Sequence, residues 1–154
     1  MVIKNLSWQK FAPYQLIQYI DKTDKIKDTQ PMYWNVSHYT TKGVIRDLEH
    51  QDSIRKLRKN STRLIHDIIS FSPEDSKHLN EAIVRDLTFE YLKLRATKQV
   101  AFGQIHRDQE HIHVHIAISL NNVNEPKSVN IDRKTYFKIR QDLELYQQKK
   151  YPQL

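Results

Sequence analysis

Residues 104–119 have the sequence QIHRDQEHIHVHIAIS and contain four of the chain's eight histidines, at positions 106, 111, 113 and 115. Residues 99–106, which lead into this stretch, are rich in apolar and aromatic side chains, and residues 112–120 are rich in β-branched ones. Both segments are predicted to be strands, with the polar residues 107–110 as the turn between them. The histidine cluster therefore predicts a hairpin, and with it a sheet that is at least partly antiparallel.

Side chains alternate between the two faces of a strand, so His111, His113 and His115 are predicted to share one face. His106 lies at the end of the preceding strand, beside the turn, and is predicted to reach the same face. A single histidine on a strand is usually a surface residue or a satisfied core residue. Several titratable rings packed together without a ligand cost desolvation and risk charge repulsion, so the cluster favours a metal or catalytic site.

The composition is that of one soluble globular domain spanning residues 1–154, because 28% of the residues are charged and 38% are hydrophobic. No apolar run approaches the ~20 residues of a membrane span, and the N-terminus does not resemble a signal peptide. The absence of cysteine excludes disulfides and thiolate metal sites, and we expect a cytoplasmic location. The net charge of +7 indicates a polyanionic partner, of which nucleic acid is the commonest.

Helical and strand patterns alternate along the rest of the chain. Residues 21–31 and 121–127 are predicted to be irregular, and residues 33–39 are either a strand or an aromatic-rich loop. The predicted helices are residues 11–21, 44–59, 72–93 and 132–151, and the further predicted strands are residues 1–6, 63–71 and 128–131. This order predicts an α+β fold with a largely antiparallel central sheet, helices packed on one face and the histidine hairpin on the other.

The segment from His106 to His115 resembles the H-x-D-x-x-(H)-x-H-x-H motif of the relaxase or mobilisation nuclease family. These proteins are the HUH-type endonucleases of conjugative and mobilisable plasmids. Residues 66–71, HDIISF, are similar to a family strand that ends in Ser-Phe and precedes a helix, and residues 16–20, LIQYI, resemble the segment that carries the family's catalytic tyrosine. The resemblance spans nearly the whole chain. One departure is Ser119, which stands where the family often has asparagine.

The resemblance implies a divalent metal ion, magnesium or manganese, although zinc also suits imidazole ligands in vitro. It assigns His106, His113 and His115 as the ligands and Asp108 as the group that orients one of the imidazoles. His111 is given a supporting or DNA-contacting role, with a plain surface histidine as an equal alternative.

The resemblance also implies site-specific nicking of single-stranded DNA at an origin of transfer, for the transfer of plasmid or mobile-element DNA. A tyrosine attacks the phosphodiester and becomes joined to the 5′-phosphate. We assign this role to Tyr19 on its local match, with Tyr14 as the alternative nucleophile. Accessory mobilisation proteins are possible partners. His66 is interpreted as a core histidine whose ring is satisfied by a backbone group, outside the chemistry.

Two other functions remain open from the sequence. Residues 111–117, HIHVHIA, also match the histidine-triad nucleotide hydrolases, in which the middle histidine attacks a nucleotide α-phosphate without a metal. The upstream His106 and Asp108, the tyrosine segment and the basic charge argue against that enzyme. The third alternative is a relaxase-like module that binds DNA without cleaving it.

Overall fold

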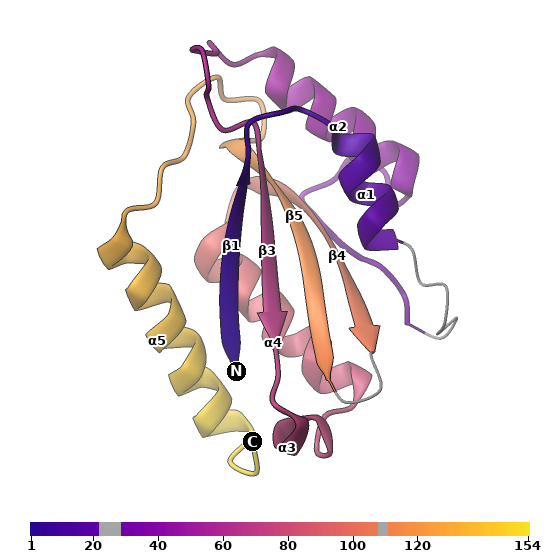
Figure 1. The fold of residues 1–154 in the computed structure, drawn as a ribbon, viewed down its shortest axis with the longest axis vertical. Helices are drawn as coiled ribbons and strands as arrows, with labels where there is room; N and C mark the ends of the chain where they lie inside the picture. The colour runs from indigo at the N-terminus through magenta and orange to yellow at the C-terminus, as the bar shows by residue number, and fades with distance from the viewer. Residues whose placement is uncertain (22–28, 108–110) are drawn as a thin grey trace.

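A computed structural model describes residues 1–21, 29–107 and 111–154. Its described strands form a five-stranded sheet of order β1-β3-β5-β4-β2, and every neighbouring pair is antiparallel. The strands are β1 (Val2–Trp8), β2 (Met32–Trp34), β3 (Leu64–Ser70), β4 (Gln99–Arg107) and β5 (Ile112–Asn122). The predicted histidine hairpin is the pair β4–β5, with β5 as the middle strand (Figure 1).

Five described helices surround the sheet: α1 (Pro13–Asp21), α2 (Thr41–Ser53), α3 (Pro73–Ser76), α4 (Glu81–Arg95) and α5 (Arg133–Lys150). The buried side chains of α4 and α5 pack with one face of the sheet in a large core, whereas those of α1 and α2 pack with the other face in a smaller one. Figure 1 shows α1 and α2 side by side near the end of the sheet where β3 begins. The predicted α+β class and the helix-covered face are confirmed, and α1 and α2 form a further layer that the sequence patterns did not indicate.

The alternation along β5 sends its side chains into these two environments. Val114 and Ile116 belong to the core beneath α4 and α5, whereas Ala117 belongs to the core beneath α1 and α2. His113 and His115 have the same parity as Ala117, so they lie on the face that α1 partly covers. Among the described residues, no helix is both long enough and apolar enough to span a bilayer.

Two predicted helices differ from the sequence patterns, one in its end and the other in its continuity. The helix predicted over residues 44–59 covers only Thr41–Ser53, because the chain turns after it and Arg55 folds back to pair with Asp52 at 2.9 Å. Leu57, an apolar residue within the predicted range, is 42% exposed. The helix predicted over residues 72–93 is divided into α3 and α4, because the Asn80 side chain accepts a hydrogen bond from the Ile83 amide and starts a new helix.

The short strands also differ in extent from the predictions. Strand β2 covers residues 32–34, so only the first two residues of the predicted segment 33–39 pair with the sheet. Residues 128–131 contribute one isolated bridge, between Asn121 and Ser128. Residues 22–28 of the predicted loop 21–31, and residues 108–110 of the predicted hairpin turn, lie outside the described residues.

Candidate metal and nucleophile site

Three histidines converge on one face of the β4–β5 hairpin. His106 is the cross-strand partner of His113, and His115 follows His113 on the same face. One ring nitrogen from each of the three lies within 4.8 Å of the others, and the ring centroids are 4.5–5.5 Å apart. His115 is buried, whereas His106 and His113 are half-buried. Three imidazoles at this spacing can hold one divalent cation and leave coordination positions open on the exposed side.

A backbone contact sets the tautomer of His106. Its Nε2 lies 2.7 Å from the carbonyl oxygen of Ile20, in α1. Because a carbonyl oxygen only accepts, Nε2 carries the proton and donates it. The lone pair of His106 is then on Nδ1, which is free for a metal ion.

A fourth histidine, His66 on β3, extends the cluster. Its Nε2 lies 2.9 Å from Nδ1 of His115, and both rings are buried. The interpretation of His66 as satisfied by a backbone group is wrong, because its partner is another imidazole. When His115 donates from Nδ1, its Nε2 keeps a lone pair for a metal, so His66 is placed to orient a ligand. The register of β3 against β5 creates this contact, and one sequence does not reveal that register.

Burial keeps the two hydrogen-bonded histidines neutral. Burial, followed by the charges of the nearby His106, His113 and His66, lowers the pKa of His115 to about 3. Burial, followed by the charge of His106, lowers the pKa of His66 to about 4. Both imidazoles are therefore unprotonated at neutral pH, the state that a ligand and its hydrogen-bond partner need.

These pKa shifts predict that the metal-free protein loses stability in acid. In the unfolded chain histidine titrates near 6.5, so between pH 6.5 and about 4 the unfolded state binds more protons and stability falls as the pH falls. From pH 6.5 to 4.5 we expect a loss of roughly 2 kcal/mol for each of the two histidines. Urea unfolding with a chelator at both pH values measures the loss. The loss of unfolding free energy should be smaller in His66→Gln and unchanged in the control His111→Gln. An equal loss in all three proteins would show that the buried histidines are not its cause.

Tyr19 lies beside the histidine cluster. In α1 the side chains of Leu16, Ile17 and Ile20 are fully buried, which fixes the helix over the sheet. The Tyr19 side chain leaves the helix at the edge of this buried stripe and is 53% exposed. Its ring centroid is 5.5 Å from that of His115 and 6.0 Å from that of His66, edge-on to both. The phenol is thus next to the proposed metal site and open to a large substrate.

The other tyrosines that precede the hairpin in the sequence have different surroundings. Tyr14 is 57% exposed, and its hydroxyl accepts a hydrogen bond from Gln18 Nε2 on the same helix, at 2.5 Å. Tyr33 packs against Tyr39 and Phe102, beside the core beneath α1 and α2. Within the described part of the chain, only Tyr19 among the tyrosines has a ring contact with the histidines.

The described part of the structure does not show the remaining residues of the predicted site, Asp108, His111 and Ser119, in the histidine cluster. Asp108 lies outside the described residues, so its orienting role stays a prediction. β5 begins at Ile112, so strand alternation does not set the direction of His111, whose side chain is exposed. Ser119 has a structural role, because its hydroxyl accepts from the Val100 amide and donates to the Asn121 carbonyl.

Known proteins share both the sequence pattern and the fold. Residues 15–150 match the family model "Relaxase: MobA/VirD2-like, nuclease domain". No curated protein matches the chain. The solved structure "MobM Relaxase Domain (MOBV; Mob_Pre) bound to 26nt pMV158 oriT DNA" is 16% identical, covers 94% of this chain and 83% of its own, and superposes with a TM-score of 0.59, which shows a shared fold. The family match covers most of the sequence and includes the tyrosine helix, the histidine hairpin and α5, and the chain therefore belongs to the MobA/VirD2-like relaxase nuclease family.

Proposed function

We propose that this chain nicks single-stranded DNA at an origin of transfer in a metal-dependent, site-specific reaction, with Tyr19 as the nucleophile. The observation that carries the proposal is the contact of the exposed Tyr19 ring with His115, one of three histidines whose ring nitrogens converge within 4.8 Å. A nucleophile beside a cation site is the arrangement that attack on an anionic phosphodiester requires.

The donor set fits a divalent ion such as magnesium or manganese, and imidazole also suits zinc. His106, His113 and His115 would hold the ion, and a bound ion would neutralise a non-bridging phosphate oxygen and polarise the phosphorus. Neutral imidazoles add no negative charge to the site, so they do not repel the phosphate. Their exposed side leaves room for a DNA strand to approach.

Tyr19 supplies the covalent step. Its phenolic oxygen forms a bond to phosphorus while the bond from phosphorus to the 3′ oxygen breaks. The phenol loses its proton and the departing 3′ oxygen gains one, so the products are a 5′-phosphotyrosyl linkage and a free 3′-hydroxyl. One phosphoester bond replaces another, and the strand can therefore be rejoined by the reverse reaction.

A nicking assay tests the proposal against the two alternatives. End-labelled single strands carrying candidate origin sequences are incubated with the protein, with manganese or with a chelator. We expect cleavage with manganese and a loss of at least about a hundredfold with the chelator, because a metal ion contributes several kcal/mol to phosphoryl chemistry. Metal-independent hydrolysis of small nucleotides would indicate a histidine-triad hydrolase, and DNA binding with neither reaction would indicate a pure binding module.

A further inference from the structure

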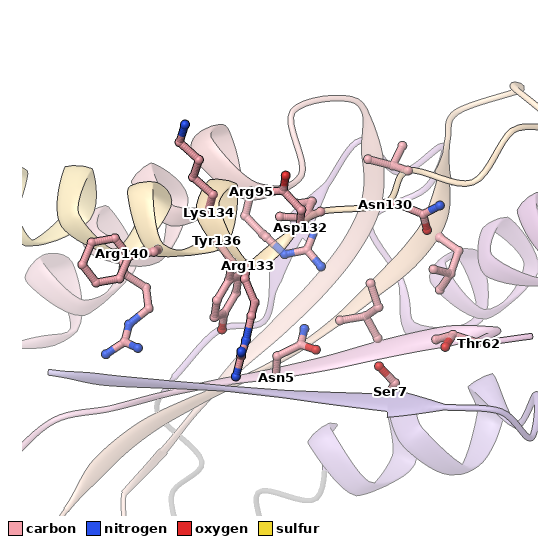
Figure 2. Close-up of a pocket in the computed structure, with 15 residues that line it drawn as sticks. Asn5, Ser7, Thr62, Arg95, Asn130, Asp132, Arg133, Lys134, Tyr136 and Arg140 are labelled. Atoms are coloured by element: carbon pink, nitrogen blue, oxygen red, sulfur yellow. The ribbon is translucent and has the colours of Figure 1, made fainter.

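A second candidate site lies on the face of the sheet opposite the histidines. A solvent-open cavity of about 780 Å³ lies between the first half of α5 and strands β1 and β3 (Figure 2). Asn5, Ser7 and Ile65 line its floor, and they share the sheet face that packs against α4 and α5. The volume is within the range of about 300–1,000 Å³ that is typical of small-molecule sites.

A buried arginine at the wall of this cavity has unused donor capacity. Arg95, at the end of α4, is 5% exposed, and its Nε lies 3.4 Å from Oδ2 of the fully buried Asp67. Asp67 also accepts hydrogen bonds from Asn5 at 2.5 Å and from Tyr91 at 2.7 Å, so the carboxylate is held in place. Nη1 of Arg95 has no hydrogen-bond partner among the described residues. A buried charged donor without a partner is costly, and an anion in the cavity would supply one.

The charges around the cavity also favour an anion. Arg133 and Arg140 contribute exposed guanidinium groups from α5, and Figure 2 shows Arg133 reaching toward β1. Asp132 is the acidic side chain of the lining, and its Oδ1 is engaged by the Thr135 amide as the cap of α5. The charges of Asp67 and Arg95 cancel each other. The two exposed arginines therefore exceed the single negative charge of Asp132, and the net charge of the lining is positive. Guanidinium groups are suited to phosphate, which they bind through paired hydrogen bonds.

Aromatic and amide groups next to these arginines indicate more than a simple phosphate. Phe137 lines the cavity although it is 59% exposed, and Tyr136 lies beside it. An exposed aromatic ring offers a stacking surface for a base, and Asn5 and Asn130 offer hydrogen bonds to its edges. We propose that this cavity binds a nucleotide unit, with its phosphate on Arg95, Arg133 and Arg140 and its base against Phe137.

The same chemistry is present in a free nucleotide and in one residue of a DNA strand. NMR titrations can distinguish these sources, with thymidine 5′-monophosphate, a twelve-residue oligothymidylate and inorganic pyrophosphate as probes. The Nε–H signal of Arg95 and the side-chain amide signal of Asn5 report on the cavity itself. Shifts with the mononucleotide indicate a free-nucleotide site, whereas shifts with the oligonucleotide alone indicate a second contact for DNA.

Substitutions of exposed residues test the contacts without disturbing the buried pair, since a change at Arg95 would leave Asp67 unpaired. Arg133→Gln/Arg140→Gln should weaken binding of nucleotide and pyrophosphate about tenfold or more, because each charged hydrogen bond contributes measurably. Phe137→Ala should weaken nucleotide binding and leave pyrophosphate binding unchanged. The control Lys98→Gln/Lys149→Gln removes the same charge from exposed positions outside the cavity and should have little effect.

Signals of Arg95 and Asn5 that do not respond to any probe would overturn the proposal. Equal weakening by the arginine and lysine pairs would also overturn it, because binding would then depend only on net charge. The readout is binding at the far face of the sheet, so it does not depend on whether Tyr19 and the histidines nick DNA.

Discussion

Tyr19→Phe is expected to abolish nicking and the covalent protein–DNA adduct, with a rate loss of at least about a thousandfold, as when other enzymes lose their nucleophile. The substitution removes one oxygen and keeps the ring that contacts His115 and His66. Leu16, Ile17 and Ile20, which anchor α1, are unchanged, so the fold and DNA affinity should be retained. Circular dichroism and fluorescence anisotropy with labelled single strands measure those two properties beside the nicking rate.

Tyr14→Phe is the matched control, because it lies on the same helix and is similarly exposed. It should lose less than a fewfold in rate. Mass spectrometry of the trapped adduct identifies the attached residue directly. A nucleotide on Tyr14, Tyr33 or Tyr39 would transfer the role to that residue, and one on a histidine would favour the triad hydrolase.

Replacement of any one of His106, His113 and His115 by alanine is expected to weaken manganese binding by more than about a hundredfold, since loss of a group that merely orients a ligand already costs 10–100-fold. Nicking should fall in parallel, because the same ion is proposed to polarise the phosphate. Isothermal titration calorimetry measures the affinity of each purified variant.

His111→Ala serves as the control for this series, because its exposed side chain lies just outside β5 and next to the cluster. We expect it to change the affinity far less than the other three. An equal loss in all four variants would argue for a different ligand set. A parent protein that binds no manganese would remove the metal site altogether.

The histidine hairpin and the buried side of α1 can be predicted from the sequence because each depends only on residues that are close together in the chain. A hairpin needs only two adjacent strands, and alternation places His113 and His115 together without knowledge of any distant residue. The same holds for Tyr19, since the apolar spacing of Leu16, Ile17 and Ile20 shows which side of α1 is buried. The structure agrees with both patterns.

The contacts that complete the site depend on pairings between distant segments. His66 meets His115 because β3 pairs with β5 in one particular register, and a shift of one residue would turn His66 to the other face. The placement of α1 on the histidine face also depends on tertiary packing, because the apolar stripe of the helix could pack on either face of the sheet. Helix ends were missed for a more local reason: Asn80 and the Asp52–Arg55 pair override the apolar periodicity.

The hydrogen bond between His106 and the Ile20 carbonyl gives the His106 side chain a structural role in addition to its proposed role as a metal ligand. Ile20 lies in the last turn of α1 that the structure describes, and its carbonyl accepts a hydrogen bond from His106 Nε2, so His106 caps this end of the helix that carries Tyr19. Loss of His106 would then both remove a metal ligand and let the turn beside Tyr19 fray. The defect of His106→Ala combines these two effects, whereas His113→Ala removes a ligand from the hairpin and leaves this cap in place.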